Sequence, residues 1–199
     1  MSSTPAESST DDIAAAAAKA EADIAAATRD ADPERADLLA MLAKSRHFLR
    51  FTTRGLTDEQ AALRTTASEL CLGGLIKHVT AAEENWARFI TEGPSPASDY
   101  SAMTPEDFAR RADQFRLLPG ETLQGVLDDY AKVADRTDEI VRAWTDLGMS
   151  RPLPKAPWFP PGESWSARRV IMHIVAETAQ HAGHADIIRE SLDGAKSMG

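Results

Sequence analysis

Apolar residues recur every three to four positions in four separate stretches of the chain, which is the spacing that places them on one face of a helix. No stretch alternates apolar and polar residues as a half-buried β-strand would. The expected long helices span residues 33–55, 68–91, 122–148 and 166–192. Four amphipathic helices joined by shorter segments predict an all-α protein with the architecture of a four-helix bundle.

Short accessory helices are expected between the long ones. Residues 57–60 (TDEQ) have the sequence of a capping box, and residues 104–107 (TPED) combine a capping threonine with proline and acids in the first turn. Proline, glycine and serine predict loops at residues 92–100 and 149–165. The second loop carries Trp158 and two further aromatic residues, so it either walls or closes a pocket, or it only covers one end of the bundle.

The chain divides into an N-terminal extension, a bundle and a short tail. Residues 1–32 form the extension, in which the first ten residues are expected to be disordered and an alanine-rich helix follows. Ile13 and Ile24 are the only large aliphatic side chains of that helix, so we expect it to be peripheral or frayed; a partner-binding arm is the alternative. Residues 33–194 form the bundle and residues 195–199 the tail.

Composition argues against several classes of protein. The net charge of −9 disfavours nucleic-acid binding, which needs a basic face, and no segment is long and apolar enough to cross a membrane. The N-terminal sequence lacks the basic and apolar regions of a secretory signal, so a cytoplasmic protein is expected. Cys71 is the only cysteine, which excludes an internal disulfide and a cysteine-rich zinc site. A homodimer is compatible with a bundle of this kind.

The last long helix carries the candidate chemistry. His173, Glu177, His181 and His184 fall within an arc of about 80° on the face that also carries apolar residues such as Ile174. These ionisable side chains are therefore expected to point into the interior. Burying them without partners costs several kcal/mol, whereas a bound cation would compensate that cost. The pattern predicts a metal site.

Spacing limits which side chains can share one ion. His173 and His181 lie about 12 Å apart along the helix axis, which is too far for one ion. Three neighbouring pairs remain open, namely His173 with Glu177, Glu177 with His181, and His181 with His184. Each pair needs a third ligand from another element. His78 on the second long helix is a candidate, although a lone histidine on an apolar face is more often a core residue.

Two segments resemble the DinB-like superfamily of helical bundles, especially an actinobacterial branch related to mycothiol-dependent maleylpyruvate isomerases and mycothiol S-transferases. They read GLTDEQAALRTTASELCLGGLIKHVTAAEENW and SARRVIMHIVAETAQHAGHADIIRESLDG, and the resemblance covers residues 36–194. In such proteins a histidine on the second bundle helix and two residues four apart on the last helix hold a metal. Carried over, the resemblance implies that His78, Glu177 and His181 are the ligands.

The chain departs from the family pattern at two positions. Many relatives have histidine where this chain has Glu177, and glutamine where it has His184. The departure leaves three roles open for His184: a group that supports a ligand, a substrate contact, or a replacement ligand. His173, one turn before Glu177, is expected to be a core residue or an outer support of the site.

The resemblance also implies the chemistry. Two imidazoles and one carboxylate suit zinc, and nickel or iron(II) would also accept them. Three protein ligands leave an open position, in which a low-molecular-weight thiol such as mycothiol would bind as thiolate. The expected activity is that of a metal-dependent S-transferase or thiol-dependent isomerase acting on a small electrophile. Candidates for lining its pocket are Asn85, Trp86, Trp158 and His184.

Two other functions stay open on the sequence. A hydrolase would use water in the open position of the metal as its nucleophile. A non-enzymatic, stress-associated binding protein would use the same residues as a structural polar network or as a metal staple for the fold. Dependence of turnover on an added thiol separates the transferase from the hydrolase, and the absence of turnover would indicate the binding protein.

Overall fold

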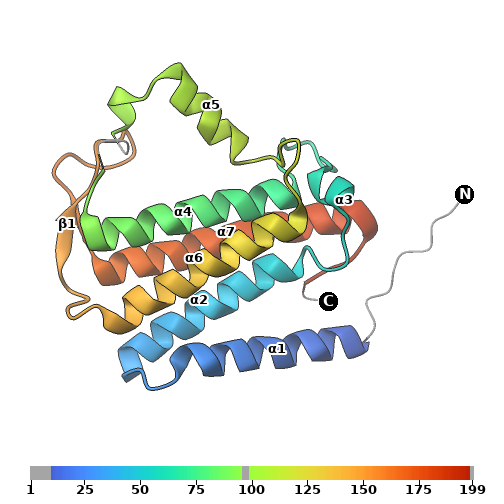
Figure 1. The fold of residues 1–199 in the computed structure, drawn as a ribbon, viewed down its shortest axis with the longest axis horizontal. Helices are drawn as coiled ribbons and strands as arrows, with labels where there is room; N and C mark the ends of the chain where they lie inside the picture. The colour runs from blue at the N-terminus through green and yellow to red at the C-terminus, as the bar shows by residue number, and fades with distance from the viewer. Residues whose placement is uncertain (1–9, 96–98, 198–199) are drawn as a thin grey trace, which may run out of the picture.

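The computed structural model describes residues 10–95 and 99–197. Within these residues the main body is a bundle of four long helices (Figure 1), namely α2 (Pro33–Phe51), α4 (Leu72–Glu92), α6 (Leu123–Ala143) and α7 (Ala167–Asp193). Helices α2 and α7 run in one direction, and α4 and α6 run in the other. The all-α architecture predicted from the apolar periodicity is confirmed.

Three of the long helices are shorter than their apolar pattern predicts, and the first of them, α2, ends at Phe51 rather than at Gly55. Helix α4 begins at Leu72 rather than at Ser68, because the Ser68 hydroxyl accepts a hydrogen bond from the backbone N–H of Leu70 (3.2 Å) and holds the chain in a local turn. Helix α6 ends at Ala143, short of the predicted end, because the backbone of Trp144 is extended. Local side-chain hydrogen bonds and turns therefore decide these last two helix ends.

A small two-stranded sheet corrects the expectation that the chain contains no strands. Strand β1 (Ser150–Pro152) pairs antiparallel with β2 (Ser164–Ser166), and together they close the proline-rich loop between α6 and α7. Each strand has three residues, which are too few to show an alternating pattern in the sequence. The Ser166 side chain then caps α7 by accepting a hydrogen bond from the N–H of Arg169 (3.2 Å). The strand pairing thus fixes the start of the helix that carries the histidines.

Helix α1 (Thr10–Thr28) packs along α2 on the outside of the bundle (Figure 1). Ala27 is buried in the apolar core and Ile24 packs against it. In addition, Arg142 of α6 donates a hydrogen bond to the carbonyl oxygen of Ala27 (2.9 Å). The predicted disorder of the first ten residues falls almost entirely outside the described part of the chain.

Residues 195–197 fold back onto α7. Ala195 is buried, and the backbone N–H of Ser197 donates a hydrogen bond to the Asp186 carboxylate (2.6 Å). The residues after the helix therefore add contacts to its last turns.

Among the described residues, short helices complete the structure: α3 (Asp58–Ala62), the 3₁₀ helix η2 (Tyr100–Ala102) and α5 (Pro105–Asp113). The predicted capping box is present with Thr57 at the start of α3, and the predicted capping residue Thr104 also forms a capping box at the start of α5. Because α4 and α6 run in the same direction, their connection has to return along the length of the bundle. Residues 99–122, here called the arm, pass over α4 with α5 at their outermost point (Figure 1).

The interior of the bundle has two apolar halves. The half nearer to β1 and β2 contains Leu42, Ile90, Val141 and Ile174. The half at the other end contains Leu49, Val79, Tyr130 and Ile188. Burial of these side chains is the main source of stability, at about 1.5–3 kcal/mol for each large aliphatic side chain. No helix within residues 10–95 and 99–197 is both long and apolar enough to span a membrane.

A polar layer separates the two apolar halves. Arg46 of α2 donates to both carboxylate oxygens of Glu83 of α4 (2.5 and 3.2 Å) and to Asp138 of α6 (2.8 Å). Arg46 and Glu83 are buried, and so is Thr178, which lies between the two apolar halves along α7. Along each of these helices, the polar residue lies between side chains of one apolar half and side chains of the other. The polar layer therefore crosses the bundle between the two halves.

Candidate metal centre

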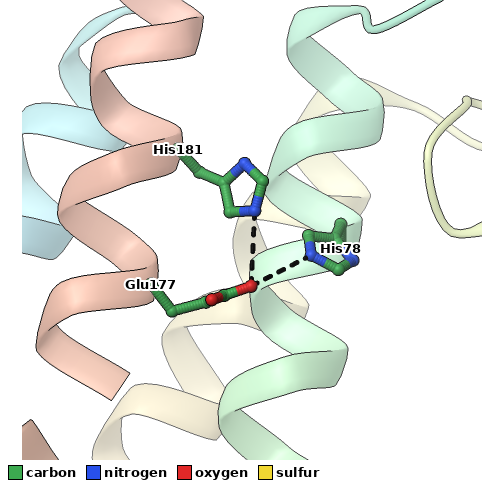
Figure 2. A group of neighbouring side chains, drawn as sticks. All are labelled: His78, Glu177 and His181. Atoms are coloured by element: carbon green, nitrogen blue, oxygen red, sulfur yellow. Dashed lines mark ion pairs between the residues drawn. The ribbon is translucent and has the colours of Figure 1, made fainter. Parts of the chain in front are cut away.

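Three side chains converge between α4 and α7 (Figure 2). His78 extends from α4, and Glu177 and His181 extend from α7. Nε2 of His78 lies 3.5 Å from Oε1 of Glu177, and Nε2 of His181 lies 3.4 Å from the same oxygen. The structure therefore brings together the three residues that the family resemblance implied as ligands.

Helix geometry explains the convergence. Glu177 and His181 are four residues apart, so their side chains lie one turn apart on the same face of α7. Helix α4 packs against α7, and the rings of His78 and His181 meet edge to face at 4.8 Å between centroids. The side chains of His78, Glu177 and His181 are 17%, 28% and 12% exposed. The site is thus partly buried but still reachable from solvent, as an exchangeable ligand requires.

The donor set and its spacing suit a divalent cation. Imidazole nitrogens and carboxylate oxygens bind zinc at about 2.0–2.1 Å, which puts tetrahedral ligand atoms roughly 3.4 Å from one another. The two nitrogen–oxygen distances of 3.4 and 3.5 Å match that value, whereas a direct N–H···O hydrogen bond is normally about 2.9 Å long. All three ligand atoms lie within 4.8 Å of one another. The two imidazoles would have to approach each other slightly around a bound ion.

Glu177 supplies the negative charge of the site. The contacts with His181 and then with His78 hold the pKa of the Glu177 carboxyl far below its usual value, and partial burial opposes them only in part. The carboxylate is therefore ionised across the physiological pH range. Its charge would offset half of the charge of a divalent cation, so the loaded site would carry a net positive charge.

His184 lies behind His181 rather than beside the ligand atoms. Nδ1 of His184 is 3.3 Å from Nδ1 of His181, while the other ring nitrogen of His181 faces Glu177. Both nitrogens of His181 are therefore engaged. A contact of this kind fixes the orientation and the tautomer of a ligating histidine.

His78 is held in a different way. Its ring stacks on Phe115 of the arm, with 4.1 Å between centroids and 24° between planes, and its buried Nδ1 has no hydrogen-bond partner among the described residues. Phe115 reaches α4 because Gly74 leaves room: a Cβ at Gly74 would lie 2.0 Å from the carbonyl oxygen of Phe115. Phe115 was missed in the sequence, where only the paired glycines Gly73 and Gly74 inside a helical pattern hint at a close approach.

An aromatic cluster begins one turn before Glu177. The ring of His173 lies 4.9 Å from that of Trp86 on α4 and 5.1 Å from that of Trp165 on β2. The two indoles stack at 5.2 Å and 14°, and Phe159 contacts both at 6.3 and 5.5 Å. Burial lowers the pKa of His173, and the charge of Glu177 acts against this shift. We call these four residues, Trp86, Phe159, Trp165 and His173, the aromatic wall.

The other residues predicted to line a pocket differ in their relation to the aromatic wall. Trp86 is a member of it, whereas its neighbour Asn85 is exposed on α4 and makes no part of the cluster. Trp158 is 56% exposed and contacts Tyr100 of the arm and Phe159 of the wall, at 4.9 and 6.0 Å between centroids. Trp158 therefore connects the wall to the arm.

Comparison with known proteins adds two findings. A family model described as mycothiol-S-transferase matches residues 37–194. Among solved structures, a similar chain is a conserved protein from Enterococcus faecalis known from a crystal structure, with a TM-score of 0.57 and 13% identity over 78% of this chain and 94% of that chain. At that identity the likeness concerns the fold alone. No curated protein matches the chain.

Proposed function

Because the chain belongs to the mycothiol-S-transferase family, we propose that it is a metal-dependent transferase or isomerase that activates a low-molecular-weight thiol, such as mycothiol, for attack on a small electrophile. The convergence of His78, Glu177 and His181 carries this proposal. Zinc suits the donor set best, and nickel or iron(II) are the alternatives.

Three side chains of the chain would hold the ion, and because each is partly exposed, a further ligand could reach it. A divalent cation held there would favour the thiolate form of a thiol near neutral pH. Glu177 would contribute an ionised oxygen, and His78 and His181 would each contribute a ring nitrogen. In a transfer reaction the sulfur forms a bond to the electrophilic carbon, the leaving group departs with its bonding electron pair, and the thiol proton passes to solvent.

His184 has a supporting role in this proposal. For Nε2 of His181 to donate a lone pair, the ring proton has to sit on Nδ1. That N–H then faces Nδ1 of His184 at 3.3 Å, which accepts it. His184 thus favours the tautomer of His181 that can bind a metal.

Metal analysis and a thiol-transfer assay test the proposal together. The purified protein is expected to hold about one ion per chain, identified by mass spectrometry of the metal content. Conjugation of mycothiol to 1-chloro-2,4-dinitrobenzene should proceed faster than the uncatalysed reaction, should stop after treatment with chelator, and should return when the ion is restored.

Single substitutions locate the site. His78→Ala and His181→Ala should each lose the ion and the catalysed rate. His47→Ala is the matched control, because it removes a histidine that stacks on Phe51 of α2 and leaves the three ligands intact. An unchanged rate in metal-free protein would overturn the mechanism. Turnover of an ester without any thiol would indicate a hydrolase, and a bound ion without any turnover would indicate a binding protein.

A further inference from the structure

The aromatic wall takes no part in holding the metal ligands. Trp86 comes from α4, Phe159 from the loop before β2, Trp165 from β2 and His173 from α7. Each ring contacts at least two of the other three. Trp165 is buried, whereas the other three are only partly buried and keep some surface open to solvent. Four elements therefore combine to present aromatic surface at one place.

The wall lies directly beside the candidate metal centre. His173 precedes Glu177 by four residues, about 6 Å along α7, and Trp86 follows His78 by eight residues, about 12 Å along α4. Because α4 and α7 run in opposite directions, both displacements point the same way, toward β1 and β2 (Figure 1). The wall thus starts one turn from the ligands and leads away from them.

Further aromatic side chains connect the wall to the arm. Tyr100 contacts Phe108 and Trp158 edge to face, at 5.3 and 4.9 Å between centroids. Phe108 and Trp158 are 41% and 56% exposed, which is unusual for such large apolar rings. Helix α5, which carries Phe108, has no buried residue. Exposed aromatic surface therefore continues from the wall to the segment that passes over α4.

We propose that the aromatic wall binds the electrophile and selects planar, aromatic or conjugated electrophiles over small aliphatic ones. This inference rests on the proposed thiol transfer. An electron-poor planar group can stack on the electron-rich indole of Trp86, while the neighbouring edges of Phe159 and His173 limit its position. Its reactive carbon would then face His78 and Glu177, where the thiol is activated.

With an aryl chloride as the electrophile, the transfer replaces chlorine by sulfur at a ring carbon. The thiolate sulfur forms a bond to the ring carbon that carries chlorine, the carbon–chlorine bond breaks, and chloride leaves with the electron pair. The proton of the thiol is released to solvent. No oxidant or reductant is needed.

Two electrophiles and four variants test the selectivity. In metal-loaded protein, Trp86→Leu should raise the KM for 1-chloro-2,4-dinitrobenzene about tenfold, because one stacking face is lost, and should leave the KM for iodoacetamide unchanged. Trp86→Phe should keep most of the affinity. Phe159→Leu changes the wall at a residue of the loop rather than of a bundle helix, and should act in the same direction. Ile187→Ala, at a site on α7 that is 61% exposed, is the control and should change neither KM.

A binding measurement separates this inference from the proposed function. Ligand-observed NMR with 1,3-dinitrobenzene, which is planar but has no leaving group, should detect binding to metal-free protein. Trp86→Leu and Phe159→Leu should weaken it, and Ile187→Ala should not. Binding without any thiol transfer would refute the proposed function and leave the wall as an aromatic-ligand site. Equal changes of both KM values, or binding that neither wall variant weakens, would overturn the inference; if Trp86→Leu does not fold, Phe159→Leu decides.

Discussion

His78 and His181 have the same side chain and face the same carboxylate oxygen, yet different neighbours hold them. His181 has its second ring nitrogen 3.3 Å from His184, whereas His78 stacks on Phe115 and has no partner for its Nδ1 among the described residues. A hydrogen bond selects a tautomer, while a stack fixes only the plane of the ring. At the residue scale, His181 is therefore the candidate ligand whose metal binding would depend on a neighbouring polar group.

Replacing His184 should change metal affinity through His181. We predict that His184→Ala weakens zinc binding about ten- to hundredfold. His184→Gln should restore most of the affinity, because an amide oxygen can accept the same hydrogen bond, and glutamine is the residue that many relatives are expected to carry there. Competition with a chromophoric chelator measures the affinity, with His47→Ala as the control. Equal affinity of His184→Ala and the unmodified protein would show that His184 does not support His181.

At the scale of single elements, the arm packs closely against α4 at two glycines, Gly73 and Gly74. A Cβ at Gly73 would lie 2.6 Å from the Leu117 side chain, and one at Gly74 would lie 2.0 Å from the backbone of Phe115. Lys77, one turn further along α4, donates hydrogen bonds to the carbonyl oxygens of Asp113 and Arg116 (3.2 and 3.0 Å). The arm is thus fastened to α4 next to His78.

Two glycine-to-alanine substitutions distinguish close packing from helix propensity. Gly74→Ala should destabilise the protein by about 1–3 kcal/mol, because the arm backbone has to move away. It should also weaken metal binding, since Phe115 would leave His78. Gly183→Ala, in the interior of α7 with nothing within 4 Å of a new Cβ, should instead stabilise by about 0.5–1 kcal/mol. Denaturant unfolding measures both, and a stabilising Gly74→Ala would contradict the packing described.

The contact between α1 and α2 should depend on pH. Burial lowers the pKa of His47 on α2, with Arg50 and Lys19 acting in the same direction and Asp23 of α1 against it. The folded state therefore binds the proton less readily than the unfolded state does. Stability from this group is complete above the ordinary histidine value of about 6.5 and decreases as the pH falls below it. His173, whose pKa burial also lowers, contributes with the same sign.

A substitution at His47 isolates its share. We predict that the midpoint of urea unfolding decreases between about pH 7.5 and about pH 5.5, and that His47→Gln reduces this decrease. The remaining decrease should come from His173 and other groups. The same loss in His47→Gln as in the unmodified protein would show that His47 is not part of the pH dependence.

At the scale of the whole molecule, the polar layer holds three helices in register. Arg46 joins Glu83 and Asp138, which lie on different helices, and burial raises the pKa of Asp138 although Arg46 acts against that shift. A buried arginine can be satisfied in few arrangements of the helices, because each wrong register leaves a charge unpaired. The layer also lies between the two apolar halves, next to Thr178, which directly follows the candidate ligand Glu177.

Breaking this layer should cost more than removing it. We predict that Glu83→Met destabilises the protein by about 3–5 kcal/mol, because Arg46 loses its main partner in the interior. The double variant Arg46→Met with Glu83→Met should be less destabilised than Glu83→Met alone, since both buried charges are gone. Unfolding free energies of the single and double variants test this. Additive losses would contradict the assignment of Arg46 and Glu83 as a coupled pair.

The sequence by itself determined the parts of this protein that depend on local spacing. Apolar periodicity gave the four long helices, capping residues gave the starts of α3 and α5, and a spacing of four placed Glu177 and His181 on one face. Spacing alone left three possible ligand pairs open on α7. The choice among them depends on where the third ligand lies, and that depends on which helix packs against α7. The family resemblance, and not the periodicity, pointed to His78.

Only the tertiary structure decided the contacts between distant segments. Arg46 meets Glu83 across 37 positions of sequence, and Phe115 covers His78 because the arm returns along α4. The strands β1 and β2, the aromatic wall and the contact of His184 with His181 also became visible only in the fold. The physical reason is that helix periodicity fixes which side chains share a face, whereas the packing of whole helices and connections fixes which faces meet.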